Sequence, residues 1–167
     1  MKKISIIACM LTLIIATSCA DYNRVVKTQD YEYKYEVAKQ YYAEGMYNRA
    51  ALLIQDVLSV LKGTDQGEES LYLSGLCNMK AHSYDAASTI FRKYYQTYPR
   101  GKYVEEARYN CGLSLYYITP EPKLDQSETY QAVTEFQNFI ENFPSSRLRP
   151  QAQEMIFKLQ DKLVEKE

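Results

Sequence analysis

The chain from residue 30 onward has a helical pattern of hydrophobic and polar positions. Apolar residues recur three and four positions apart, and the stretches between these segments contain Gly, Pro, Ser and Asp. The pattern predicts an all-α fold of three helical hairpins and a final helix. The predicted helices are Tyr31–Glu44 with Asn48–Lys62, Glu68–Ala81 with Tyr84–Tyr98, Tyr103–Tyr117 with Thr129–Asn142, and then Leu148–Glu165.

An internal repeat of 37 residues runs through these hairpins. In the first helix of each hairpin it aligns Tyr35 with Tyr72 and Tyr109, Ala38 with Gly75 and Gly112, and Tyr42 with Met79 and Tyr116. In the second helices it aligns Ala50 with Ala87, and the third copy, Ala132, comes eight residues late. A repeat of this length indicates a solenoid of stacked hairpins.

The repeated residue types suggest how the helices pack. The small residues let the two helices of a hairpin approach closely, and Ile54, Phe91 and Phe136 are expected to fill the space between neighbouring hairpins. Pro99 and Pro144 each follow a second helix, because proline cannot continue it. The late third copy is explained by a loop over Ile118–Ser127, which contains two prolines.

This arrangement resembles the tetratricopeptide repeat, a superhelical stack of antiparallel helical hairpins whose usual period is about 34 residues. The resemblance implies that the first helices line a concave groove. Aromatic side chains with a polar tip are efficient anchors at binding surfaces, which makes the tyrosines there candidates for protein binding. The candidate groove residues are Tyr35, Lys39, Tyr42, Tyr72, Leu76, Met79, Tyr109, Leu113 and Tyr116. The alternative is that packing between hairpins covers them.

The first residues read as an export signal. Lys2 and Lys3 precede an uncharged apolar stretch that ends in small residues before Cys19, and the stretch is too short to span a bilayer comfortably. A cysteine in that place resembles the lipobox of bacterial lipoproteins, so residues 1–18 are expected to be cleaved and Cys19 to carry N-acyl and diacylglycerol chains. Residues 19–30 would then be a lipidated tether. The alternative is an ordinary signal with an incidental cysteine.

The charge of the chain narrows the class of partner that it can bind. Removal of residues 1–18 changes the formal net charge from −1 to −3, and no basic block remains, so nucleic acid is not expected as a partner. Cys77 and Cys111 fall inside apolar helical patterns. We expect two buried thiols, although a disulfide between them is the alternative in an exported protein.

The sequence offers no catalytic or metal-binding constellation. His82 is the one histidine, it falls at a predicted bend, and no cluster of metal-ligand residues surrounds it. The pairs Glu68/Glu69 and Glu105/Glu106 begin first helices, where carboxylates stabilise the positive end of the helix dipole. We therefore expect no enzymatic activity and no cofactor apart from the lipid.

The chain also resembles the BamD family of lipoproteins, part of the machinery that folds β-barrels into the bacterial outer membrane. The resemblance rests on the tether Asp21–Val25, the stretch Leu61–Asp65, the turn Tyr98–Gly101, the insertion Pro120–Gln126 and the helix Phe157–Leu163. It implies a scaffold on the periplasmic side of the outer membrane that binds BamA, other subunits of the machinery and unfolded outer membrane proteins. The runner-up interpretation is a different periplasmic tetratricopeptide lipoprotein that acts as an adaptor in envelope biogenesis.

The final helix, Leu148–Glu165, carries an apolar stripe with no predicted helix after it to cover that stripe. A solenoid needs a polar outer face on its last helix. Since the family resemblance implies five repeats, we expect the repeat domain over residues 31–167 to be truncated, which puts binding of BamA by this chain in doubt. The alternative is a partner that covers the stripe.

Overall fold

The computed structural model describes residues 22–165, and all regular secondary structure within them is helical. A short leading helix at residues 22–27 is followed by seven longer ones. These are α2 Tyr31–Ala43, α3 Tyr47–Val60, α4 Asp65–Lys80, α5 Tyr84–Thr97, α6 Val104–Ile118, α7 Ser127–Asn142 and α8 Arg149–Val164. Each predicted helix is present, and its ends lie within three residues of the prediction.

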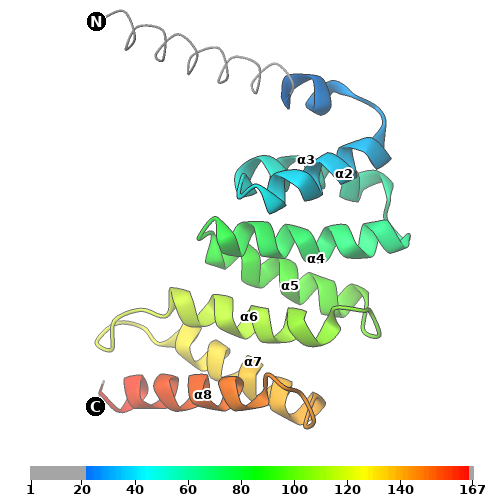
Figure 1. Ribbon diagram of the computed structural model, residues 1–167. Helices are drawn as coiled ribbons and strands as arrows, with labels where there is room; N and C mark the ends of the chain where they lie inside the picture. The colour runs from blue at the N-terminus through cyan, green and yellow to red at the C-terminus, as the bar shows by residue number, and fades with distance from the viewer. Residues whose placement is uncertain (1–21, 166–167) are drawn as a thin grey trace, which may run out of the picture.

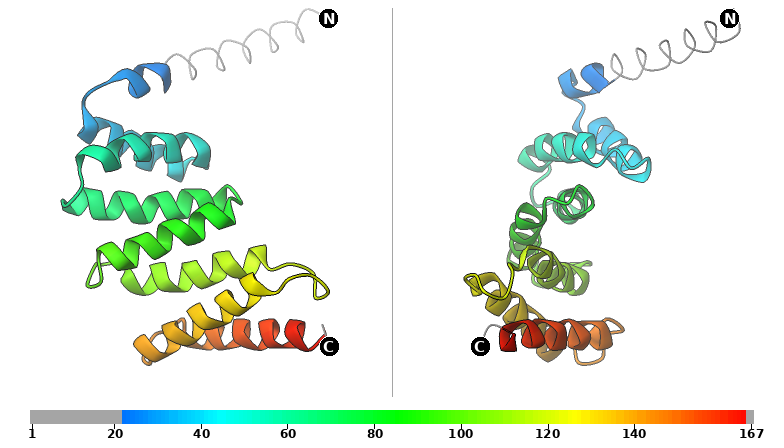
Figure 2. Two further views of the ribbon diagram at one scale, coloured as in Figure 1. Left: turned by 180° about the vertical axis from the view of Figure 1, so that it is seen from behind. Right: turned by 90° about the vertical axis from the view of Figure 1, so that its left-hand side faces the viewer.

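The helices stack in chain order as three antiparallel hairpins, α2–α3, α4–α5 and α6–α7, followed by α8 (Figure 1). Both views in Figure 2 show the leading helix and α8 at opposite ends of the stack. Each helix packs on the next, and in addition α2 contacts α4 and α6 contacts α8. The first helices therefore approach each other on the inner side of a superhelix, as in the tetratricopeptide fold, and α3, α5 and α7 form its outer side.

The repeated small residues lie where the two helices of a hairpin touch. Ala38, Ala50, Ala87 and Ala132 are fully buried. A Cβ atom built on Gly75 would lie 2.5 Å from Cε1 of Phe91, and one built on Gly112 would lie 3.0 Å from Cε1 of Phe136.

The two phenylalanines thus pack on the glycine of their own hairpin. We expected them to fill the space between neighbouring hairpins, and that expectation was incomplete: the missing side chain of the glycine leaves a ring-sized space inside each hairpin, and the ring occupies it. Both rings also belong to a core that continues through α8, so they contribute to both interfaces.

The hydrophobic core is continuous from the leading helix to α8. One buried cluster joins the leading helix with α2, α3 and α4, and a second joins α4 with α5, α6, α7 and α8. Leu58 and Leu76 pack against both clusters, so the two clusters join into one core. Cys77 and Cys111 are buried free thiols within this core, as we expected, and burial raises the pKa of each thiol to about 12.

The predicted loop between α6 and α7 is present and is held by Gln126. This side chain is 1% exposed, and its Nε2 donates to the carbonyl oxygens of Glu121, Pro122 and Leu124 at 2.8, 3.2 and 3.2 Å. The Thr129 hydroxyl donates to Gln126 Oε1 at 2.7 Å. A proline-rich segment is therefore ordered around one buried amide.

The predicted tether over residues 19–30 contains a short helix within its described part. Residues 22–27 are helical, and Val25 is 4% exposed in contact with the first hairpin. Lys34 Nζ donates to the Val26 carbonyl oxygen at 3.0 Å and to Asp56 Oδ2 at 2.9 Å. The alternation of apolar and polar residues here is too short to predict a helix, and only tertiary contacts fix it.

Candidate functional site

The candidate groove residues lie on α2, α4 and α6, the three helices of the inner side, but they differ in exposure. Lys39, Tyr42, Tyr72, Leu76, Met79, Tyr109, Leu113 and Tyr116 are half-buried. Tyr35 is 3% exposed, so the expectation that its ring faces an open groove is wrong. Lys39 covers that ring, with Nζ 4.8 Å from its centroid, and burial together with the neighbouring Glu69 carboxylate raises the pKa of the Tyr35 hydroxyl.

At the middle of the inner side, Tyr72 forms the centre of an aromatic cluster. Its ring stacks on Tyr103 at 4.5 Å with an interplanar angle of 3°, and it lies 5.8 Å from Phe91 and 5.7 Å from Tyr94. Burial raises the pKa of the Tyr72 hydroxyl to about 12. These contacts hold one face of the ring in the core, so the side chain serves packing and offers only part of its surface to a ligand.

A second aromatic group extends the surface toward the turn between α4 and α5. Tyr116 lies edge-on to Tyr117 at 5.6 Å, and Tyr117 stacks on Tyr84 at 4.6 Å. His82 Nδ1 is hydrogen-bonded to the Tyr84 hydroxyl at 2.7 Å, and the backbone of His82 has a φ of 60° at the turn. Tyr117 is 51% exposed and was not among the predicted residues, because it is outside the repeated columns.

The carboxylates at the starts of the first helices link successive hairpins. Glu68 Oε1 accepts hydrogen bonds from the Tyr94 hydroxyl at 2.6 Å and from the backbone N–H of Lys102 at 2.7 Å. One repeat later, Glu105 accepts a hydrogen bond from the Ser146 hydroxyl. These contacts explain why a glutamate recurs there: it joins a first helix to the turn that opens the next unit. The helix-dipole role that we predicted is compatible with these contacts.

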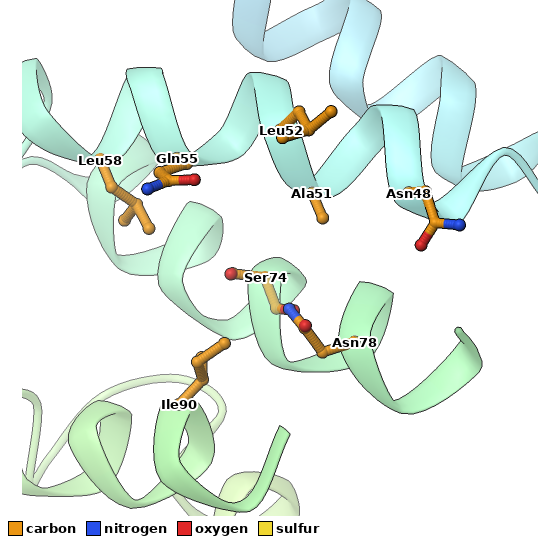
Figure 3. Close-up of a pocket in the computed structure, with 8 residues that line it drawn as sticks. All are labelled: Asn48, Ala51, Leu52, Gln55, Leu58, Ser74, Asn78 and Ile90. Atoms are coloured by element: carbon orange, nitrogen blue, oxygen red, sulfur yellow. The ribbon is translucent and has the colours of Figure 1, made fainter. Parts of the chain in front are cut away.

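The outer side carries a cleft of about 530 Å³ between α3 and α5, with α4 behind it. Figure 3 shows its residues: Ala51 on α3 and Ile90 on α5 point toward the space between these helices, and Ser74 and Asn78 of α4 lie between them. The lining contains no charged side chain; it consists of Asn48, Ala51, Leu52, Gln55, Leu58, Ser74, Asn78 and Ile90. Leu52 is 57% exposed, so an apolar side chain is accessible from solvent here.

The repeat explains why the cleft is open at this place. Between α5 and α7, Arg92 donates to Glu135 Oε1 from Nε and Nη2 at 3.2 and 3.0 Å, and the Tyr95 hydroxyl donates to the same carboxylate at 3.0 Å. The positions equivalent to these three residues in the preceding interface are Gln55, Ile90 and Leu58. The polar link is therefore replaced by one amide and two aliphatic side chains that leave a gap. This cleft was not predicted, although the exchange of residues is visible once the repeats are aligned.

No set of three or more His, Cys, Asp or Glu side chains within residues 22–165 is placed to hold a metal ion. None of the helices described is both long enough and apolar enough to cross a membrane. The predicted signal peptide and the acylation site Cys19 lie outside the described residues.

Comparison with known proteins gives two matches. A family model described as YfiO, outer membrane lipoprotein, matches residues 29–167. The outer membrane protein assembly factor BamD of Pasteurella multocida (strain Pm70) is 25% identical over an alignment of 169 positions, which covers 95% of this chain and 63% of that relative. The chain thus spans somewhat less than two thirds of the length of this curated relative.

Proposed function

The chain belongs to the YfiO family of outer membrane lipoproteins, and we propose that it is a periplasm-facing scaffold of the machinery that assembles β-barrel proteins into that membrane. The observation that carries the proposal is the family match over residues 29–167, together with a relative named as an outer membrane protein assembly factor. The fold supports it, because a repeat stack with half-buried aromatics along one side offers an extended surface for protein partners. In this role the chain binds proteins and does not catalyse a reaction.

In the proposal the membrane anchor is a lipid on Cys19. Cleavage before this residue would leave a mature chain that begins a few residues before the leading helix. Buried methylenes contribute about 0.8 kcal/mol each, so one acyl chain holds a protein weakly and several hold it durably. Incorporation of labelled palmitate into the protein, and its loss in a Cys19→Ser variant, tests this part.

The proposed client site is the inner surface of α2, α4 and α6. Its half-buried tyrosines and Leu113 would contact aromatic and aliphatic side chains of an unfolded barrel protein. Such a segment is extended and alternates apolar and polar residues, so a row of fixed anchors along one side of a solenoid suits it. Tyr35 is not among these anchors, because its ring is buried.

Co-purification tests the scaffold role. The full chain, expressed in its own envelope and solubilised gently, should bring down the BamA barrel protein or unfolded outer membrane proteins. A chain with the same anchor and a disrupted stack, Phe91→Asp, serves as the control for adhesion through the lipid. Recovery of cell-wall enzymes in place of both partner types would contradict the assembly role and favour an adaptor in envelope biogenesis.

Photo-crosslinking tests the client surface. A photoreactive residue at Tyr116 on the inner side should crosslink to a synthetic peptide that alternates apolar and polar residues and ends in Phe. The matched outer position is Leu52, which lines the cleft between α3 and α5. Crosslinking from Leu52 and none from Tyr116 would move the client site to the outer side and overturn the inner-surface proposal.

A further inference from the structure

The leading helix at residues 22–27 is fixed rigidly to the first hairpin. Tyr22 packs against Tyr41 with ring centroids 5.9 Å apart, and the Arg49 guanidinium lies over the Tyr22 ring at 5.1 Å. On the other side, Lys34 is 3% exposed and bonds both the Val26 carbonyl and the Asp56 carboxylate. These contacts tie the helix to α2 and α3, so its outward face has a defined orientation relative to the whole stack.

That outward face is basic. A hollow of about 650 Å³ lies between the leading helix and the first turn of α2, and it is lined by Arg24, Lys27, Thr28 and Tyr33. Arg24 and Lys27 are exposed, and no ion pair joins them to any residue in the described part of the chain. The positive hollow contrasts with the formal net charge of −1 of the whole chain.

Two described carboxylates, Asp30 and Glu32, lie close to this hollow in sequence, but neither of them lines it. Asp30 is the N-cap of α2, where Oδ1 accepts a hydrogen bond from the Tyr33 backbone N–H at 2.9 Å. Within the described residues no carboxylate lines the hollow. Tyr33, 51% exposed, and Val26, 38% exposed, add an aromatic and an aliphatic side chain next to the two cations.

The length of chain before the leading helix places this patch close to a membrane. Tyr22 is three residues after Cys19, and three residues reach at most about 11 Å even when fully extended. If Cys19 carries the lipid, the leading helix must lie at the level of the headgroups. Exposed cations together with an amphipathic aromatic ring are the combination that binds at an anionic interface.

We propose that Arg24, Lys27 and Tyr33 form a headgroup-binding patch for anionic phospholipids, and that this patch sets the orientation of the superhelix on the membrane. The inference rests on the proposed acylation of Cys19 for the position of the patch. Lipid chains alone leave the protein free to rotate about its anchor, whereas a second contact through the rigidly docked leading helix restricts the tilt. The inner surface would then face a constant direction.

Fluorescence of the acylated full chain in vesicles tests the patch. The chain has no tryptophan, so Tyr33→Trp introduces a single tryptophan that can be excited selectively. Tyr130→Trp, exposed on α7, is the matched control. The vesicles are phosphatidylethanolamine mixed with either phosphatidylglycerol or neutral phosphatidylcholine, with a trace of dansyl-labelled headgroups. Energy transfer from the Tyr33→Trp fluorophore should be higher with phosphatidylglycerol than with phosphatidylcholine, whereas the Tyr130→Trp fluorophore should show little transfer in both.

Charge reversal gives the second measurement. Arg24→Glu with Lys27→Glu should reduce the population of chains in headgroup contact by about fivefold per cation removed. Lys93→Glu with Arg100→Glu changes the net charge equally on exposed positions of another hairpin and should have no effect. Raising the salt to about 1 M, where the Debye length is about 3 Å, should lower the transfer from the chain with an intact patch in phosphatidylglycerol to the level seen in phosphatidylcholine. This measurement needs no charge reversal.

The outcomes separate the two proposals. If the acylated chain shows equal transfer in both lipid mixtures, the patch is overturned while the lipid anchor stands. If Cys19 is not acylated but the chain still binds phosphatidylglycerol vesicles in a salt-dependent way through Arg24 and Lys27, the anchor fails and the patch stands. Failure of both, with no palmitate incorporation and no vesicle binding, overturns both.

Discussion

The Glu68 carboxylate and the Tyr94 hydroxyl are hydrogen-bonded at 2.6 Å across the second hairpin. Tyr94 is fully buried, and its hydroxyl also accepts a hydrogen bond from the backbone N–H of Tyr103 at 3.0 Å. Because Glu68 holds the Lys102 backbone N–H as well, one carboxylate fixes the turn that opens the third hairpin. The position of the third hairpin relative to the second therefore depends on Glu68, a residue outside the apolar core.

Replacement of Glu68 by Ala is expected to lower the free energy of unfolding by about 2 kcal/mol. The substitution leaves the Tyr94 hydroxyl and the Lys102 N–H without their charged acceptor, and hydrogen bonds to charged groups contribute about 1.5–3 kcal/mol. Urea denaturation followed by circular dichroism measures the change. The control is Glu36→Ala, whose contact to Lys39 at 3.7 Å is solvent-accessible and should contribute less than about 1 kcal/mol. Equal losses in both variants would mean that the link between hairpins adds no stability.

Replacement of Gly75 by Ala should destabilise the protein even though alanine favours helices. The new methyl group would lie 2.5 Å from Cε1 of Phe91, and overpacking of a core costs about 1–3 kcal/mol, more than the gain of about 1 kcal/mol in helix propensity. Gly112→Ala is the matched case with a wider spacing of 3.0 Å to Phe136, and it should be close to neutral. Thermal denaturation compares the two.

The double variant Gly75→Ala with Phe91→Leu should recover part of the stability that Gly75→Ala loses, since the smaller side chain makes room for the methyl group. If the double variant loses as much unfolding free energy as the two single variants together, or more, the close contact between ring and glycine is not the source of the loss.

Stability is expected to fall as the pH rises above about 9. Burial raises the pKa of the Cys77 and Cys111 thiols from 9.0 to about 12, so the folded state keeps protons that the unfolded state releases. The stabilisation is fully present below the unfolded pKa and is lost as the pH rises toward the folded pKa, by at most about 1.4 kcal/mol per pH unit for each thiol. Urea denaturation between pH 8 and pH 10, with a reductant present, measures the slope.

The double variant Cys77→Ala with Cys111→Ala provides the control for this pH dependence. It should be less stable at pH 8 because two buried side chains become smaller, yet it should lose less stability between pH 8 and pH 10. The tyrosines with raised pKa values, such as Tyr72 at about 12, begin to contribute only above pH 10. An unchanged slope in the double variant would assign the alkaline sensitivity to other groups.

The loop between α6 and α7 should depend on Gln126. Replacement of Gln126 by Ala removes the buried donor to three carbonyl oxygens, with an expected loss of about 1–3 kcal/mol. The loop should then open locally, and trypsin should cleave after Lys123 faster than in the unaltered protein. Ser127→Ala, at the exposed neighbouring position, should stay within about 0.5 kcal/mol and keep the original cleavage rate. A protected Lys123 in the Gln126 variant would show that the loop is held in another way.

The helices and their order were predictable from sequence because their information is local. Apolar spacing locates each helix, and the recurrence of Tyr35, Ala38 and Ala50 in later hairpins shows that one packing solution is repeated. The loop before α7 follows from its prolines and from the delay of eight residues in the position of Ala132. Apolar spacing can be read within a single hairpin, and the repeat and its delay can be read from the sequence distance between two hairpins.

The exposure of the candidate site could not be predicted in the same way. Tyr35, Tyr72 and Tyr109 share a column, yet only Tyr35 is buried, and Lys39 Nζ lies 4.8 Å from the centroid of its ring. The outer cleft likewise depends on which side chains meet between α3 and α5, and the lack of a counterpart to the Arg92–Glu135 ion pair there is a property of two segments 35 residues apart.

The sequence by itself therefore determined the all-α class, the repeat, the helix boundaries to within three residues and the burial of the two thiols. Only the tertiary structure decided that residues 22–27 form a docked helix, that Glu68 links two hairpins, that Tyr35 is covered and that a cleft opens on the outer side. The physical reason is that helix periodicity and small-residue spacing are set by neighbours three or four positions away. Exposure, ion pairing and charge at a surface are set by residues that come together only when the hairpins stack.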